Sequence, residues 1–252
     1  MRAELVKLLK RKIYWVMLAI FAVVMAMVAF LLLGLPSIAP EAMEGFGGIR
    51  KPAAYTFGAA QALSQTWFPL VLGVVLLGGE TGSTIWAGVL TMESRRWRHL
   101  LVRWLVTAAA SWVAMLAAIA GWAAVASALA EGFGSPSTGE WLAIVWKAGL
   151  VQLTWVAVAF GAVGLLRSVG PALGLALALS FGEGLFALWR PWQNVSISLA
   201  QSRLIGEFGE LTSGVGLLTS GEMGFGRAVA IVLGWTAVGV GASILGLQVR
   251  DP

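Results

Sequence analysis

Six long runs of mostly apolar residues constrain this chain more than any other feature of its sequence. The first run, residues 13–35, contains no charged side chain, and five further runs cover residues 57–79, 105–130, 141–166, 169–189 and 228–249. About 20 apolar residues in a helix are enough to cross the hydrocarbon core of a bilayer, which is ~30 Å thick. A chain in lipid must satisfy its own backbone polar groups, so such runs predict helices. We therefore expect an all-α membrane protein with six transmembrane helices in a single domain, residues 1–252.

Composition supports a membrane protein and argues against several classes of soluble function. Hydrophobic residues make up 59% of the chain and charged residues 12%, with a mean hydropathy of +0.86. An average soluble domain has roughly 25% charged residues. There is no cysteine and one histidine, His99, so we expect no disulfide and no multi-histidine metal site in one copy. We interpret the net charge of +5 as a basic face that meets anionic lipid, and expect no nucleic-acid partner.

The motifs of the common enzyme classes do not occur in this sequence. It contains no G-x-x-x-x-G-K-[ST] loop for nucleotide phosphates, no G-x-S-x-G nucleophile motif and no H-E-x-x-H zinc motif. We therefore expect no catalytic residue, no metal and no cofactor in this chain itself.

The distribution of lysine and arginine predicts the orientation of the chain. If the N-terminus is cytoplasmic, eleven of the 17 basic residues fall on the cytoplasmic side, and the positive-inside rule favours that placement. The cytoplasmic set is Arg2, Lys7, Lys10, Arg11, Lys12, Arg95, Arg96, Arg98, Arg103, Arg167 and Arg250, and the outer set is Arg50, Lys51, Lys147, Arg190, Arg203 and Arg227. We expect both termini in the cytoplasm.

The first twelve residues have the pattern of an amphipathic helix. Leu5, Leu8, Leu9 and Ile13 recur at helical spacing on one side, whereas Lys7, Lys10, Arg11 and Lys12 supply the basic side. This pattern predicts a helix over residues 1–12 that lies in the membrane interface before the first span. A simpler interpretation, that these residues only supply cytoplasmic charge, would not need the apolar stripe.

The segment between the second and third runs, residues 80–103, also has the pattern of a structured element. Ser83 or Thr84 could cap a helix there. The apolar positions of that helix would be Ile85, Trp86, Val89, Leu90 and Met92, followed by a basic flank. An apolar helix held under the membrane by basic residues predicts a docking surface for a soluble partner.

These two segments carry a resemblance to a known family. In the permease subunits of type-2 (ABC-2, type V exporter-like) ATP-binding-cassette exporters, an elbow helix with an E-x-x-K-x-x-[KR] pattern precedes span one, and here Glu4, Lys7 and Lys10 match it. After span two, that family carries E-x-x-G-T, a leucine-rich helix and P-x-S-R. This chain has Glu80-Thr-Gly-Ser-Thr84, Val89-Leu90 and Met92-Glu-Ser-Arg95, with Ser83 and Met92 in place of the family's glycine and proline. The resemblance covers the whole chain, because its length and six-run layout also fit.

The resemblance implies an export function that needs partners. A separate ATPase subunit would bind ATP and Mg²⁺, and a coupling helix between spans two and three would dock on it. The residues implied in coupling are Glu80, Thr84, Trp86, Val89, Met92, Ser94, Arg95 and Arg96. A second permease copy would complete a homodimer or heterodimer in the plasma membrane of a bacterium. Small bacteriocin-immunity, peptide-toxin and multidrug exporters are similar in size, which suggests a hydrophobic peptide, a lipid-like molecule or a drug as substrate.

A few polar residues inside the apolar runs are candidates for a transport pathway. Glu183 is the only acid of the fifth run, and an acid at membrane depth is a candidate functional residue. Its alternative interpretation is that the helix ends early and the carboxylate reaches the outer headgroups. Gln61 and Gln65 could contact a substrate, whereas hydrogen bonding between helices explains them and Gln152 more simply.

The last two runs and the segment between them predict close helix packing and an outer element. Small residues recur every fourth position in the fifth run and in the sixth, a spacing that lets helices approach closely, either within the chain or in a dimer. Between the runs, Ile197, Ala200, Leu204, Phe208 and Leu211 share one face of a predicted helix opposite Gln201 and Ser202, which we interpret as a re-entrant or lid helix. Two other functions remain open: a membrane protein that does not transport, such as a sensor or assembly factor, and a secondary transporter.

Overall fold

Every secondary-structure element in the part of the chain that the structure describes is a helix. The structure is a computed structural model that describes residues 2–30, 65–81, 96–129, 137–186, 189–205 and 223–248. Four helices are long and apolar enough to cross a membrane: α2 (Lys12–Ala29), α8 (Arg96–Leu129), α9 (Thr138–Leu166) and α14 (Phe225–Gln248). Two further helices, α6 (Trp67–Thr81) and α10 (Val169–Phe186), have shorter apolar stretches, Trp67–Gly79 and Val169–Glu183. The remaining helices are α1 (Arg2–Lys10), α11 (Arg190–Gln193) and α12 (Ile197–Ile205). The prediction of an all-α fold is confirmed for the described residues, and the apolar helices fit a membrane protein.

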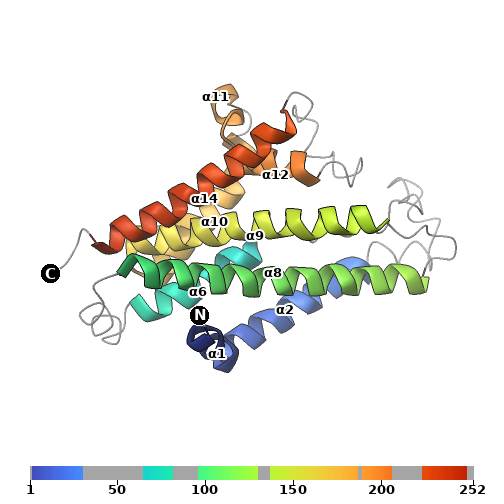
Figure 1. Cartoon of the computed structure of the whole chain (residues 1–252), viewed down its shortest axis with the longest axis horizontal. Helices are drawn as coiled ribbons and strands as arrows, with labels where there is room; N and C mark the ends of the chain where they lie inside the picture. Colours follow the sequence, from blue (N-terminus) through green and yellow to red (C-terminus); the bar gives the residue numbers. More distant parts are fainter. Residues whose placement is uncertain are drawn as a thin grey trace.

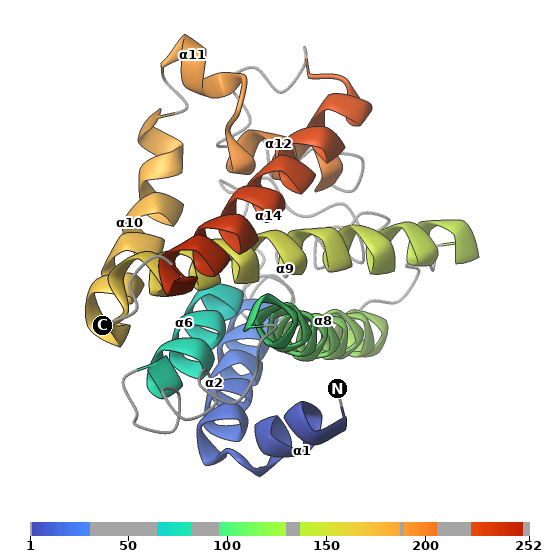
Figure 2. The same cartoon turned by 60° about the vertical axis from the view of Figure 1, so that its left-hand side comes forward.

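Helix α9 forms the centre of the bundle. Helices α6, α8, α10, α12 and α14 pack around it, with α14 crossing it and α8 beside it, whereas α1 and α2 lie beyond α8 (Figures 1 and 2). In the most apolar 18-residue stretch of α9, 72% is buried inside the chain. The corresponding share is 28% for α2, 33% for α8 and 22% for α14. The outer helices therefore keep most of their apolar surface for lipid, whereas α9 is enclosed by protein.

Glycines allow α14 to lie directly on α9. A Cβ atom at Gly164 would come within 2.5 Å of the Cα of Ser243 on α14. A Cβ at Gly239 or Gly246 of α14 would overlap the backbone of α9, at Ala157 and Gly164 respectively. Since lipid supplies no hydrophobic force between helices, this close approach stabilises the pair through dispersion contacts.

Polar tethers show that successive apolar helices run in alternating directions. At one end of the bundle, Arg11 and Arg103 both donate to the carbonyl of Leu76 near the end of α6, and Arg167 donates to the carbonyl of Gly246 near the end of α14. At the other end, the hydroxyls of Thr66 and Ser180 lie 2.7 Å apart before α6 and near the end of α10. The first end is rich in basic residues. We call it the basic end.

Arg167 ends α9 in the left-handed conformation, with a φ of 51°. Its backbone N–H donates to the carbonyl of Val163, and its guanidinium donates to Gly246 at 2.9 Å. A cation beside the last carbonyls of a helix also complements the helix dipole. Arg167 therefore stops α9 and joins its end to that of α14.

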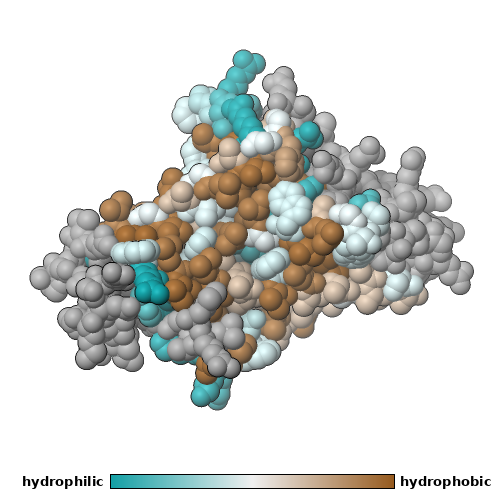
Figure 3. Space-filling view, viewed as in Figure 1, coloured by the Kyte–Doolittle hydropathy of each residue, from teal (hydrophilic) through white to brown (hydrophobic). Residues whose placement is uncertain are grey.

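The surface of the bundle is apolar around its middle. Hydrophobic residues cover the central part of the face in Figure 3, and hydrophilic residues gather toward its edges, near α11 and α1. Large side chains such as Val23, Val113 and Val238 are 60–64% exposed on α2, α8 and α14. A soluble monomer rarely exposes so continuous an apolar surface, so this distribution fits a chain surrounded by lipid.

The helices agree with the predicted runs in position, with one clear difference in length. Parts of the predicted spans, residues 31–35 and 57–64, lie outside the described residues. Helix α8 begins at Arg96, nine residues before the predicted start of the third span, so the helix is longer than the apolar run. A hydropathy criterion stops at charged residues, but arginine is a good helix former, and the helix continues out of the apolar region.

Candidate functional site

Glu183 is held by the first turn of α12. Its carboxylate is fully buried and accepts a hydrogen bond from the hydroxyl of Ser196 at 2.5 Å and one from the backbone N–H of Ser198 at 3.2 Å. Ser196 is the N-cap of α12, because its Oγ accepts from the N–H of Leu199. The carboxylate therefore takes up a free donor of that helix end, where a negative charge is favourable. Its other oxygen has no hydrogen-bond partner among the described residues.

The sequence left open whether Glu183 is buried or reaches the outer headgroups, and this arrangement answers part of that question. The carboxylate is enclosed by α10 and α12 of its own chain and does not lie exposed at the end of a helix. Ser196 and Ser198 were missed as partners, since a serine after a proline-containing segment gives no distinctive pattern. Whether Glu183 contributes to a transport pathway stays a prediction.

Lys147 is a buried charge inside the bundle. The orientation count assigned it to the outer set, and it lies near the N-terminal end of α9 with only 2% of its surface exposed. Its ammonium group lies 6.0 Å from the ring centroid of Trp146 and 5.8 Å from that of Phe225. An ammonium over aromatic faces gains a cation–π interaction that partly offsets its removal from water. Its position within the run 141–166 was the sequence signal for a charge at membrane depth.

Of the three glutamines, Gln152 has the role between helices that the sequence favoured, whereas the contact of Gln65 is local. The side chain of Gln152 is fully buried and accepts from the hydroxyl of Ser111 on α8 at 2.5 Å, so it joins α9 to α8. Gln65 accepts from the indole N–H of Trp67 at 3.0 Å, a contact within its own segment. Gln61 lies outside the described residues.

The outer helix α12 buries the face that the pattern predicted. Ile197, Ala200 and Leu204 have at most 1% of their surface exposed, whereas Phe208 and Leu211 lie outside the described residues. Gln201 was assigned to the polar side, and this is wrong: it is 5% exposed and accepts from the indole N–H of Trp155 on α9 at 2.9 Å. Position 201 follows Ile197 by four residues, so it shares the buried face, and its amide satisfies a buried donor.

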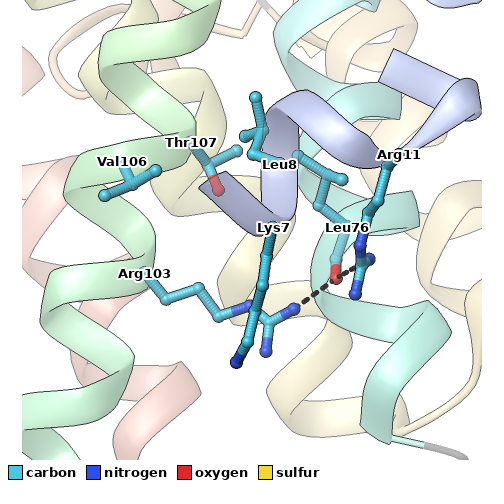
Figure 4. Close-up of a pocket in the computed structure, with 7 residues that line it drawn as sticks. All are labelled: Lys7, Leu8, Arg11, Leu76, Arg103, Val106 and Thr107. Carbon is cyan, nitrogen blue, oxygen red and sulfur yellow. Dashed lines mark hydrogen bonds between the residues drawn. The ribbon is translucent and has the colours of Figure 1, made fainter. Parts of the chain in front are cut away.

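The predicted elbow residues lie at the basic end of the bundle. Helix α1 buries Leu8, which is 6% exposed, and leaves Lys7 and Lys10 exposed. Arg11 lies between α1 and α2, and its guanidinium reaches the carbonyl of Leu76 at 3.4 Å. Glu4 lies on α1, but its side chain is not described. The structure thus brings Lys7 and Arg11 toward Arg103 of α8 (Figure 4). The sequence placed Arg103 only among the cytoplasmic basic residues.

The predicted coupling residues fall almost entirely outside the described residues. Thr84, Trp86, Val89, Met92, Ser94 and Arg95 all belong to residues 82–95. Glu80 lies in the last turn of α6 and Arg96 begins α8, and neither side chain is described. The segment therefore connects the basic ends of α6 and α8, which is where the sequence predicted it.

Comparisons with known proteins do not assign the chain to a family. No protein-family model matches it, and no curated protein matches it either. Among the described residues, no group of three or more His, Asp or Glu residues could hold a metal ion.

Proposed function

We propose that this chain is the membrane-spanning permease subunit of an ATP-driven exporter of the ABC-2 type. The observation that carries the proposal is helix α1, an amphipathic basic helix that packs against α2 and α8 at the basic end of the bundle. An elbow helix of the family would occupy this place. The Glu80–Arg95 motif follows at the same end, between α6 and α8.

In this proposal all six apolar helices cross the membrane. Helix α6 has 15 residues, about 22 Å at 1.5 Å per residue, which is short for a bilayer of ~30 Å. Residues 57–64 precede it and are apolar in sequence, so we include them in the span. The alternating directions of the helices then put both termini and the basic end in the cytoplasm, in agreement with the positive-inside rule.

A second permease copy is part of the proposed transporter. On α10, Ala172 and Ala176 are buried within the chain, whereas Gly170, Gly174 and Ala178 are exposed. A Cβ atom at Gly170 or Gly174 would meet nothing within 4 Å. The row with Ala172 and Ala176 thus packs inside the bundle. The row with Gly170, Gly174 and Ala178 leaves room for a helix of a homodimer or heterodimer partner. The exported substrate would be amphiphilic: a hydrophobic peptide, a lipid-like molecule or a drug.

ATP hydrolysis by the reconstituted complex tests the function. The experiment co-expresses this chain with the ATP-binding-cassette ATPase encoded beside its gene and reconstitutes both in proteoliposomes. We expect no hydrolysis by the chain alone and stimulated hydrolysis by the complex. Trp86→Asp should reduce complex recovery and stimulation at least tenfold, because a buried aromatic residue often carries ~2 kcal/mol or more of an interface.

The conservative variant Trp86→Phe is the matched control and should retain most of the stimulation. Hydrolysis by the chain alone would contradict the assignment of a subunit without its own ATPase site. A gene neighbourhood without such an ATPase, or a chain that binds no ATPase, would favour the sensor, assembly-factor or secondary-transporter alternatives.

A further inference from the structure

A pocket opens at the basic end between α1, α6 and α8. It is lined by Lys7, Leu8, Arg11, Leu76, Arg103, Val106 and Thr107 and has a volume of about 260 Å³, including the open space at its mouth. Figure 4 shows Arg11 and Arg103 approaching the carbonyl oxygen of Leu76 from two different elements, with Lys7 coming from α1. The walls thus come from three segments that are far apart in sequence.

The lining is strongly positive. Three of the seven residues are cationic, and none of the residues that line this pocket is acidic. Arg103 and Arg11 donate to the same neutral oxygen of Leu76, at 2.8 Å and 3.4 Å. Arg103 is only 5% exposed, so its charge is poorly screened by water.

The surroundings of the pocket are apolar. Leu8 and Val106 form part of its wall, and each is at most 6% exposed. Beside it, Val6 and Leu9 of α1 and Ile13 of α2 are 43–45% exposed. A ligand there would meet cations at one end and apolar side chains at the other. That combination fits an amphiphile with an anionic headgroup.

We propose that this pocket binds the phosphate group of an anionic phospholipid. The guanidinium groups of Arg11 and Arg103 can donate to phosphate oxygens in a forked geometry, and Lys7 adds a point charge. The hydroxyl of Thr107 adds a further donor on the wall. The acyl chains would lie against the exposed apolar face of α2. This proposal rests on the membrane placement of the chain and not on its proposed transport function.

Lipid binding to the purified full chain tests the proposal. Detergent-purified, lipid-depleted chain is titrated with short-chain phosphatidylglycerol, and the bound lipid is counted by native mass spectrometry. We expect saturable binding of one lipid per chain, weaker binding of phosphatidylcholine, and an affinity reduced about tenfold or more in the double variant Lys7→Gln/Arg11→Gln. Arg103 is left unchanged because its buried bond to Leu76 also supports the fold.

The double variant Lys10→Gln/Lys12→Gln is the matched control. It removes the same charge from the same stretch of the chain, but neither residue lines the pocket, so its affinity should fall less than twofold. Equal losses in the two double variants would overturn the proposal, since they would indicate only general surface attraction. Displacement of the lipid by millimolar inorganic phosphate would also overturn it, in favour of a soluble phosphate ligand.

Discussion

At the scale of single residues, the buried and half-buried charges Glu183, Lys147 and Arg167 are placed where a helix end or an aromatic face receives them. Glu183 accepts from the N-terminal turn of α12, and Arg167 donates to the C-terminal turn of α14. Both placements follow the sign of the helix dipole. A charge in lipid is costly unless it is neutralised, paired or hydrogen-bonded, so these contacts explain how the bundle tolerates them.

Replacing Glu183 tests its role as the acceptor for α12. Glu183→Ala leaves the Ser196 hydroxyl and the Ser198 N–H without this partner and should lower the free energy of unfolding by about 2 kcal/mol. Glu183→Gln keeps a carbonyl oxygen for both donors and should lose clearly less. Unfolding in mixed micelles of mild detergent and dodecyl sulfate measures both changes.

Ser202→Ala is the control on α12. The Ser202 hydroxyl is exposed, so its loss should change the free energy of unfolding by no more than ~0.5 kcal/mol. A Glu183→Ala variant as stable as the wild type would show that the carboxylate does not hold α12. Glu183→Lys should be worse than alanine, since it buries a cation at the positive end of a helix.

The partners of individual polar residues were the features least predictable from the sequence. The sequence singled out Glu183 because an acid in an apolar run is unusual, but it could not identify Ser196 and Ser198 as its partners. Contacts across a turn depend on the path of the backbone, and the spacing of residues in the sequence does not determine that path. Gln201 was placed on the wrong side because amide side chains are usually exposed, whereas here the indole N–H of Trp155 needs an acceptor.

At the scale of elements, α9 and α14 form the most extensive helix–helix contact in the described bundle. Gly161 and Gly164 of α9 face Gly239, Ser243 and Gly246 of α14. The sequence predicted close packing from small residues at four-residue spacing, and Gly246 was among them. It did not identify the contacting face, because α14 carries small residues on more than one side: Gly234 and Gly241 have nothing within 4 Å of a Cβ atom.

Alanine substitutions at two kinds of glycine should therefore have opposite effects. At Gly239, the added methyl group meets the carbonyl of Ala157 and should destabilise the chain by about 1–3 kcal/mol. At Gly241, the methyl group meets open space, and alanine should be neutral or stabilising by up to ~1 kcal/mol through its helix propensity. Gly234→Ala repeats the control. Thermal unfolding of the purified variants in one detergent separates the two groups.

If Gly239→Ala and Gly241→Ala shift the unfolding midpoint equally, the close approach of α14 to α9 is wrong. The comparison is strict, because the two residues lie two positions apart on one helix. Intrinsic propensity is therefore the same at both, and only the neighbouring helix differs.

At the scale of the whole molecule, charge and hydropathy determine the layout. The apolar runs predicted the class of fold and the approximate position of each helix, since an apolar helix has few alternatives to lipid. They could not predict that α8 extends to Arg96, because a helix may leave the apolar region without a change in its backbone. They also could not predict the pocket at the basic end, which needs α1, α6 and α8 to meet.

The basic end provides the most direct prediction for the molecule as a whole. With six crossings, Ser94 before α8 and Ser168 between α9 and α10 lie in the cytoplasm. Ser137 before α9 and Ser202 on α12 lie outside. If only α2, α8, α9 and α14 crossed, the residues before α8 would lie on the outer side and this pattern would change. Because the chain contains no cysteine, each site can be tested with one introduced cysteine and no background.

The decisive measurement is labelling of Ser94→Cys, Ser137→Cys, Ser168→Cys and Ser202→Cys with a membrane-impermeant maleimide in right-side-out and inside-out vesicles. The account predicts that Ser137→Cys and Ser202→Cys react in right-side-out vesicles, and that Ser94→Cys and Ser168→Cys react only in inside-out vesicles. Labelling of Ser94→Cys from the outside, or of Ser168→Cys and Ser202→Cys from the same side, would contradict a six-span bundle with a cytoplasmic basic end.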